Sequence, residues 1–154
     1  MGDDHRMPTL QRVIDELPAD LAALREEARA EGYRFVERLA TDWTSGTIRF
    51  DREGEALLAA RLSGVLAGIG GLTIEPVVPH ALRMRRFCIR LAYRRSGIGR
   101  MLVTALLERA RSTSRLVTVN AGPGSAAFWE SLGFAPDARD GHTHVQQLGE
   151  RRRS

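Results

Sequence analysis

A glycine-containing loop between an apolar strand and an amphipathic helix constrains the fold of this chain more than any other stretch. The loop is Arg94-Arg95-Ser96-Gly97-Ile98-Gly99. Before it, residues 86–91 alternate polar and apolar side chains, with Phe87, Ile89 and Leu91 on one face, which is the period of a β-strand. After it, apolar residues recur at helical spacing. They are Ile98, Leu102, Ala105, Leu106 and Ala110. The order of strand, loop and helix predicts an α/β protein.

The start of the predicted helix is suited to binding a phosphate group. The first backbone N–H groups of a helix lack partners, and the aligned peptide dipoles place about half a positive charge there. Gly97 and Gly99 let a bulky diphosphate approach the backbone, and Arg94, Arg95 and Arg100 add positive charge. A plain tight turn is the alternative. The spacing does not match a G-x-x-x-x-G-K-[ST] loop, and the third glycine of a dinucleotide-binding loop is missing.

The rest of the chain predicts a mixed sheet flanked by helices. We expect strands over residues 9–15, 56–62, 65–74, 83–91, 116–119 and 143–148, and helices over 18–31, 36–43 and 126–132 besides the one after the loop. Pro18 suits a first helical turn, and Ser125 suits an N-cap. Glycines 68, 70 and 71 would weaken an ordinary strand, so they predict a bulge or the close approach of another group to the backbone.

Composition predicts one domain. A hydrophobic content of 43% in 154 residues suffices for a single core, which we place at about residues 9–148, followed by a basic tail at 149–154. No apolar run approaches the roughly 20 residues of a membrane span, and the acidic segment 1–5 is unlike a signal peptide. We therefore expect a cytoplasmic protein with no membrane partner. Cys88 is the single cysteine, and no Cys/His cluster has zinc spacing, so no metal is expected.

The charged residues argue against a nucleic-acid partner. All 23 residues of the Lys/Arg class are arginine, and 19 acidic residues reduce the net charge to +4. The two signs are interspersed and aromatic residues are few, unlike a nucleic-acid-binding surface. The one basic cluster, Arg151-Arg152-Arg153, is typical of a solvated chain end. The sequence leaves both a monomer and a homodimer open.

Two motifs resemble those of one enzyme family. Arg94-x-x-Gly97-x-Gly99 resembles the R/Q-x-x-G-x-G/A signature of the GNAT superfamily of acyl-CoA-dependent N-acetyltransferases, whose loop holds the pyrophosphate of coenzyme A. The segment 116–134, which ends in Leu132-Gly133-Phe134, is similar to a later strand and helix of that family. The resemblance covers about Leu57 to Leu148. It implies a single-domain GNAT-like α/β fold, acetyl-CoA as the acyl donor, and transfer to an amine of an unidentified small molecule or peptide.

The resemblance also implies which residues hold acetyl-CoA. Cys88 and Ile89 would bind the pantetheine arm through their backbone, and the Ile89 N–H would polarise the thioester carbonyl. The loop would cradle the pyrophosphate, and Phe128 would pack along the cofactor. Asn120 would contact the cofactor arm, although an asparagine also simply favours turns. The implied set is Cys88, Ile89, Arg94, Arg95, Ser96, Gly97, Ile98, Gly99, Arg100, Asn120, Phe128 and Trp129.

Trp129 departs from the family pattern. Many relatives carry there a tyrosine that protonates the coenzyme A thiolate, whereas an indole N–H has no useful acidity. Trp129 either donates a hydrogen bond to the sulfur or fills the core. A thiolate of pKa about 8.5 can leave without a dedicated acid, so activity is compatible with this departure. Leu91 is a second departure, because proline is frequent at that position.

The general base is the weakest part of the sequence pattern. In relatives an acidic residue on a central strand activates the amine. Glu75 is the nearest acidic residue here, and a solvated strand end before Pro76 is the alternative interpretation. His144, on the predicted last strand, could face either the core or the site. Cys88 as an acyl-carrying nucleophile has no neighbouring residue that would activate it.

Two functions therefore remain. One is an N-acetyltransferase in which the amine attacks acetyl-CoA directly in a ternary complex. The other is a non-catalytic acyl-CoA-binding or regulatory module on the same fold, which Trp129 and the missing base would favour. No motif identifies the acceptor. Arg83, Arg85 and Arg86 point either to an acidic acceptor or to the 3′-phosphate of the coenzyme.

Overall fold

The computed structural model describes residues 7–139 and 141–149 and forms one mixed sheet flanked by helices. In chain order the elements are β1 (Thr9–Arg12), α1 (Leu21–Ala30), α2 (Phe35–Ser45), β2 (Ala56–Leu62), β3 (Val65–Ile74), β4 (Ala81–Ile89), the 3-10 helix η2 (Leu91–Tyr93), α3 (Ile98–Ala110), β5 (Leu116–Val119), α4 (Ala126–Ser131), β6 (Ala135–Arg139) and β7 (His142–Gln147). The segment 1–5 and the predicted basic tail beyond Gly149 lie outside the described residues.

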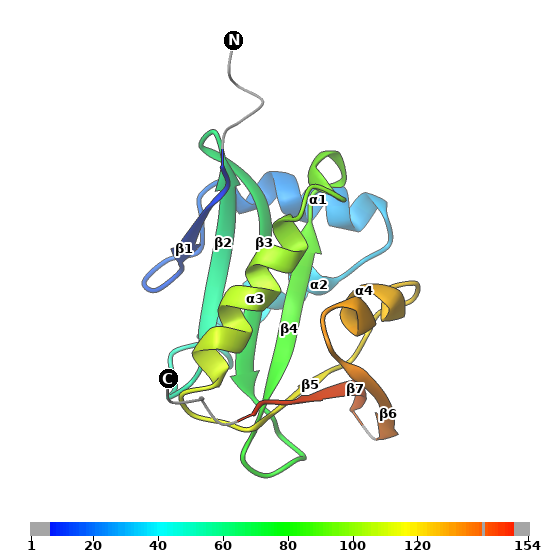
Figure 1. Ribbon diagram of the computed structural model, residues 1–154. Helices are drawn as coiled ribbons and strands as arrows, with labels where there is room; N and C mark the ends of the chain where they lie inside the picture. The colour runs from blue at the N-terminus through cyan, green and yellow to red at the C-terminus, as the bar shows by residue number, and fades with distance from the viewer. Residues whose placement is uncertain (1–6, 140, 150–154) are drawn as a thin grey trace.

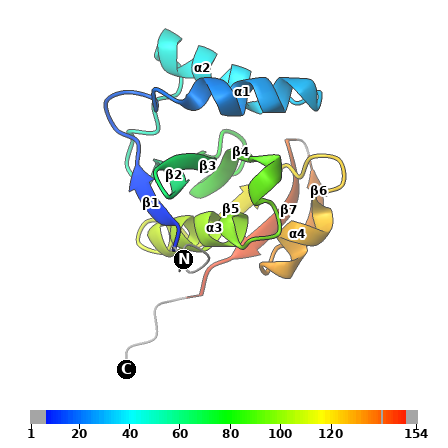
Figure 2. The ribbon, with the colours of Figure 1, turned by 90° about the horizontal axis from the view of Figure 1, so that it is seen from above.

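The sheet has the strand order β1-β2-β3-β4-β5-β7-β6 (Figure 1). Its neighbouring strands are antiparallel except β4 and β5, which are parallel and joined by α3. The predicted β-α-β unit is thus confirmed, and with it the α/β class. Helices α1 and α2 cover one face of the sheet, and α3 and α4 lie on the other (Figure 2).

The hydrophobic core has two layers, one on each face of the sheet. Leu24, Leu39 and Ile69 are among the buried side chains between α1, α2 and the sheet. Val103 and Val117 belong to the layer under α3. Fully burying one such side chain stabilises the fold by about 1.5–3 kcal/mol, so these layers fix the sheet against its helices.

The parallel strands β4 and β5 pair over only part of their length. Their register runs from Ala81 opposite Leu116 to Met84 opposite Val119, where β5 ends. The second half of β4 continues to Ile89 beside β3 alone. Figure 1 shows β5 turning away from β4 toward α4. One edge of β4 is therefore open in the middle of the sheet.

A β-bulge interrupts β4 at the point where this edge opens. Ile69 and Gly71 of β3 lie opposite Cys88 and Arg85, so β4 carries one more residue than β3 in this interval. Arg86 has a φ of +61°, in the left-handed region. A bulge of this kind redirects a side chain out of strict alternation. It places the Arg85 and Arg86 side chains on the same face of the sheet, where they bond to β3 and α2 respectively.

The glycines of β3 make room for side chains of neighbouring segments, as the sequence predicted. A Cβ atom at Gly70 would lie 2.5 Å from Cε1 of Phe87, and one at Gly68 would lie 2.6 Å from Cδ1 of Ile89. Gly71 similarly faces the ring of Phe50. These contacts confirm the expected close approach. The expected bulge is confirmed as well, because β3 carries one more residue than β2 between Gly68, which pairs with Ala60, and Leu66, which pairs with Arg61.

Three local expectations differ from the structure. Pro18 lies in a turn before α1, because the N–H of Leu21 donates to its carbonyl and begins the helix there. Leu91 is 64% exposed in η2 and does not extend the strand. The strand β6 was not predicted, because it contains Pro136 and lacks apolar alternation, features that an edge strand tolerates.

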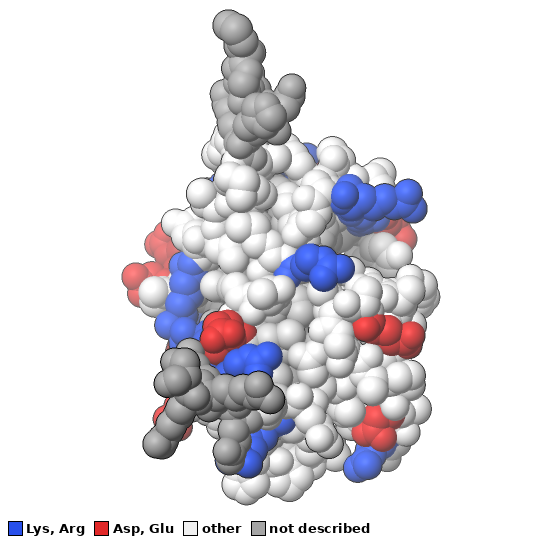
Figure 3. All heavy atoms as spheres, viewed as in Figure 1, with Lys and Arg blue, Asp and Glu red and all other residues white. Residues whose placement is uncertain are grey.

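Two surface properties bear on the expected partners. On the face that carries α3, basic and acidic side chains are interspersed, as the sequence pattern suggested (Figure 3). A search of residues 7–139 and 141–149 finds no helix with the length and apolar character needed to cross a membrane.

Candidate functional site

Two adjoining cavities form a cleft where β4 and β5 diverge. The larger, of about 720 Å³, lies against the loop that precedes α3. The smaller, of about 190 Å³, lies further back along β4, beside Met84 and Arg85. The two cavities share walls from the α1–α2 connection, β4 and α4, so the cleft is continuous. The shared residues are Tyr33, Phe35, Phe87, Pro123, Ser125 and Phe128.

Most of the residues predicted to hold a cofactor line this cleft. Those at the larger cavity are Cys88, Ile89, Arg94, Arg95, Gly97, Gly99, Arg100 and Phe128. Asn120 and Trp129 line the smaller cavity, which Phe128 also reaches. Ser96 and Ile98 line neither cavity. The Ser96 hydroxyl donates to the Tyr93 carbonyl, and Ile98 is buried beneath α3.

The open edge of β4 presents a backbone donor to the cleft. The N–H of Arg90 donates to the carbonyl of Ala67 at 2.9 Å, so this N–H points toward β3. Successive N–H groups of a strand point to opposite edges, and the Ile89 N–H therefore faces the side where β5 is absent. The Ile89 carbonyl, on the same edge, accepts a hydrogen bond from Nε of Arg94 at 2.9 Å.

The loop before α3 exposes a helix start to the larger cavity. Gly97 precedes the helix with a φ of +90°, and Arg95 has a φ of +65°. The side chains of Arg95 and Arg100 are exposed and make no ion pair within the part of the chain that the structure describes. Gly99 serves packing as well as access, because a Cβ there would lie 3.1 Å from Cζ of Phe128.

Arg94 is engaged by the protein itself. Its guanidinium pairs with Glu31, the residue that follows α1, with Nη2 2.6 Å from Oε1, in addition to the hydrogen bond to Ile89. The hydrogen bond and charge of Arg94 hold the pKa of Glu31 below its ordinary value. One turn earlier on α1, Glu27 pairs with Arg90 at 2.6 Å. These two pairs fasten the loop to α1, so Arg94 positions the loop that Arg95 and Arg100 surround.

Trp129 fills an aromatic cluster behind the smaller cavity. The side chain is 5% exposed. Its ring meets those of Phe87, Phe128 and Phe134 edge-on, with centroids 5.1, 5.1 and 5.3 Å away. Pairs of this geometry contribute about 0.5–1.5 kcal/mol each beyond the area that they bury. Of the two roles considered for Trp129, the packing role is the one that these contacts support.

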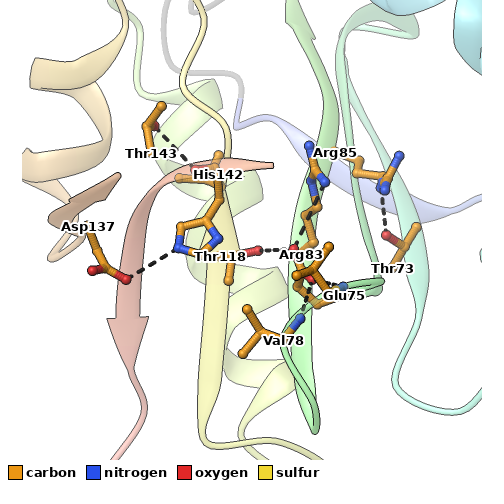
Figure 4. A network of polar contacts seen from close by, with 11 residues as sticks. Thr73, Glu75, Val78, Arg83, Arg85, Thr118, Asp137, His142 and Thr143 are labelled. Atoms are coloured by element: carbon orange, nitrogen blue, oxygen red, sulfur yellow. Dashed lines mark hydrogen bonds and ion pairs between the residues drawn. The ribbon is translucent and has the colours of Figure 1, made fainter. Parts of the chain in front are cut away.

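Glu75 lines neither cavity; it lies in the turn between the end of β3 and the start of β4. Its carboxylate is buried and accepts hydrogen bonds from the backbone N–H groups of Val77 and Val78 and from the hydroxyl of Thr118 (Figure 4). Burial alone would raise its pKa. The hydrogen bonds and the nearby charge of Arg83 outweigh that effect and lower the pKa. Glu75 is thus neither the solvated strand end nor a group at the cavities; it caps the turn after β3.

The two other candidates for proton transfer or nucleophilic attack are not suited to these roles: His144 lines neither cavity, and the Cys88 thiol stays protonated. His144 lies 2.8 Å from Glu130 and 2.7 Å from Thr143 through its two ring nitrogens, and it lines neither cavity. Burial raises the pKa of the Cys88 thiol to about 11, which disfavours a nucleophilic thiolate. Among the described residues, the cavity walls contain no aspartate, glutamate or histidine.

Sequence reasoning missed one wall of the cleft, and it placed Ser125 correctly at the N-cap of α4 but predicted a side-chain capping bond that does not form. Tyr33 and Phe35, stacked with centroids 5.5 Å apart, close both cavities from the α1–α2 connection, where no spacing signals a site. Ser125 does not cap α4 through its side chain. Its hydroxyl donates instead to the Gly122 carbonyl at 2.8 Å, which tightens the turn after β5. The Asn120 side chain is exposed at the smaller cavity and makes no hydrogen bond within the described residues.

A cleft that begins at a basic, glycine-containing helix start suits a ligand with phosphate groups. Its continuation between diverging parallel strands agrees with the acyl-CoA site that the resemblance of the motifs implies. The sequence matches the family model described as the Acetyltransferase (GNAT) family over residues 20–134, so the chain belongs to this family. The match starts well before Leu57, where the resemblance in the motifs began. None of the curated proteins compared with the chain matches it.

Solved structures share this fold. A putative acetyltransferase from Exiguobacterium sp. 255-15 superposes with a TM-score of 0.84 at 22% identity, over 92% of this chain and 93% of that one. The GNAT family N-acetyltransferase YhbS from Escherichia coli, in complex with CoA, gives 0.67 at 16% identity, over 94% and 83%. N-acetylglutamate synthase from Neisseria gonorrhoeae, complexed with coenzyme A and L-arginine, gives 0.69 at 12% identity, over 94% of this chain and 34% of that one.

Proposed function

We propose that this protein is an N-acetyltransferase that moves the acetyl group of acetyl-CoA to an amine of a small molecule or peptide, by direct attack in a ternary complex. The observation that carries the proposal is the continuous cleft, in which a helix start, an open strand edge and a second cavity follow one another. Membership of the acetyltransferase family and a structural neighbour in complex with CoA support the donor.

The larger cavity suits acetyl-CoA. The N–H groups at the start of α3 and the unpaired cations of Arg95 and Arg100 would hold the pyrophosphate. The pantetheine arm would lie along the open edge of β4. There the Ile89 N–H would donate to the thioester carbonyl and stabilise the oxyanion as the amine attacks. A backbone donor fixed by the sheet needs no reorganisation during the reaction.

Proton transfer would rely on water and on the local charge. The neutral amine forms the new C–N bond, the C–S bond breaks, and the thiolate leaves with the electron pair. Because no carboxylate or imidazole lines the cavities in the described chain, the ammonium proton passes to solvent. The guanidinium group of Arg85, which has no ion pair within the described residues, lowers the pKa of a nearby ammonium and so favours the reactive neutral form. The thiolate is stable enough to leave and take a proton from water.

The second candidate is a non-catalytic acyl-CoA-binding module, which the packed Trp129 favours, as does the lack of a carboxylate or imidazole among the described residues that line the cleft. Incubating the full chain with acetyl-CoA and a panel of amines, and following free thiol, separates the two. An enzyme releases thiol only with certain amines and yields the matching amide by mass spectrometry. Tight binding of acetyl-CoA in calorimetry without amide formation from any amine would contradict the proposed transfer and leave the binding module.

A further inference from the structure

The smaller cavity contains an arginine that has no acidic partner among the residues that the structure describes. We infer that the acceptor amine carries a carboxylate group and that Arg85 binds this carboxylate. The inference rests on the proposed function, because it names the class of molecule that occupies the acceptor end of the cleft. Three observations support the inference: the neighbouring arginines are paired with carboxylates, the terminal N–H donors of Arg85 are unused within the described residues, and Arg85 lies at the acceptor end of β4.

Each of the neighbouring arginines already has a carboxylate partner. Nη2 of Arg86 lies 2.9 Å from Oδ2 of Asp42 in α2, and both side chains are largely buried. Nη1 of Arg83 lies 4.0 Å from Oε1 of the buried Glu75. Arg85 has no carboxylate within ion-pair distance in residues 7–139 and 141–149. In Figure 4 the Arg85 side chain is directed toward Thr73, whereas Arg83 makes a separate contact with Glu75.

The hydrogen bonds of Arg85 leave its outer edge available. Nε donates to the hydroxyl of Thr73 at 2.9 Å, which fixes the plane of the guanidinium. Its two terminal amino groups make no hydrogen bond within the described residues, and neither is among the fully buried unpaired atoms. A guanidinium held at Nε with both terminal groups accessible matches the planar, two-pronged geometry of a carboxylate.

The electrostatics of the cavity favour an anion. Burial, followed by the charges of Arg83 and Arg86, lowers the pKa of Arg85, so the surrounding protein disfavours its cation. An arginine stays charged nonetheless, and a bound carboxylate would remove this unfavourable interaction. The same charge repels an acceptor with an additional ammonium group, such as a polyamine.

The position of Arg85 separates it from the phosphate groups of the donor. Arg85 lines the smaller cavity and not the larger one, whereas Arg95 and Arg100 line the larger one. Arg85 also precedes Ile89 by four residues, which the bulge sets opposite three residues of β3, from Gly71 to Gly68, so the two lie roughly 10 Å apart along the strand. The ring of Phe87 forms a wall of both cavities between these points. Arg85 therefore suits the acceptor and not the 3′-phosphate of the coenzyme.

The test compares matched acceptors. α-Amino acids and their carboxamides are supplied in pairs with acetyl-CoA, and kcat/KM is measured for each. We expect the preferred amino acid to exceed its amide by about 10- to 100-fold, the range of a hydrogen bond to a charged group. Arg85→Gln should reduce this ratio to near one without changing the Kd of acetyl-CoA. Arg85→Lys should keep part of it. Arg111→Gln, an equal change of charge at the far end of α3, should keep all of it.

A binding measurement makes the outcome independent of turnover. N-acetyl amino acids and their amides are titrated by calorimetry into the full chain saturated with coenzyme A, with circular dichroism confirming that each variant is folded. Selective binding of the acids that Arg85→Gln abolishes supports the carboxylate site, even if no amine is acetylated and the proposed transfer fails. Equal use of acids and amides, binding of neither, or a preference for polyamines overturns the inference. If amides are acetylated efficiently, the carboxylate site is wrong while the proposed acetyl transfer still holds.

Discussion

At the loop end of the cleft the strand edge, helix start and cations offered to a ligand all belong to one continuous segment, residues 88–100, whereas the groups at the Arg85 end come from parts of the chain far apart in the sequence. At the loop end the groups offered to a ligand are mainly backbone, at a strand edge and a helix start. At the other end Arg85 comes from β4, its hydrogen-bond partner Thr73 from β3, and Trp129 from α4. A site made of local backbone leaves a sequence signature, and a site made of distant side chains does not.

The largest expected effect is on the Kd of acetyl-CoA, when positive charge is removed at the loop end alone. In the double variant Arg95→Gln/Arg100→Gln, the Kd of acetyl-CoA should rise about 100-fold, because each arginine contributes a charge-assisted interaction with phosphate. The loss should shrink at high salt, since exposed charges are screened. Calorimetry at two salt concentrations measures it, with Arg38→Gln/Arg111→Gln as the charge-matched control. An unchanged Kd would show that the loop does not hold the phosphates.

The same contrast explains how much of the protein the sequence predicts. The hairpin 56–74 and the helix from Ile98 follow from local periodicity and turn residues, and both are confirmed. The engagement of Arg94 by Glu31 depends on how α1 packs over the loop, which no local pattern encodes. The burial of Glu75 and the bulge at Arg86 likewise depend on pairing across the sheet. Sequence alone therefore indicates the donor loop and leaves its chemistry incomplete.

A second change tests whether the two ends share a wall. Phe87 lines both cavities and lies directly over Gly70, so Gly70→Ala would force its ring to move. We expect a loss of about 1–3 kcal/mol in the free energy of unfolding and a severalfold rise in both the Kd of acetyl-CoA and the acceptor KM. Urea denaturation and steady-state kinetics measure these. Gly149→Ala, at a position with no atom within 4 Å, is the control. A change confined to one end would mean that the ends are independent.

Glu75 tests whether a base lies outside the cleft. Because its carboxylate caps a turn, Glu75→Gln should lower stability by about 1–3 kcal/mol and leave kcat per folded molecule nearly unchanged. Its lowered pKa means that the folded state favours the carboxylate. This contribution is therefore present above the ordinary pKa of 4.5 and is lost as the pH falls below it. Wild-type protein should lose stability faster than the variant below pH 4.5. A collapse of kcat in a stable Glu75→Gln protein would instead assign catalysis to Glu75.

The smallest effect on turnover is expected at Cys88, which lies in the donor cavity and yet has no part in direct transfer. Cys88→Ala should change kcat by less than about twofold, because a thiol whose pKa is raised to about 11 by burial is protonated at neutral pH. The raised pKa means that the folded state retains this proton. Its contribution to stability is complete below pH 9 and is lost as the pH rises from 9 to 11, so wild-type protein should lose stability relative to the variant in that interval.

Cys88 is the single cysteine of the chain, so mass spectrometry after mixing with acetyl-CoA alone can detect an acetylated thiol without ambiguity. Such an adduct, formed and consumed at the rate of turnover, would replace direct attack by a two-step transfer and would make the donor end chemically active in its own right.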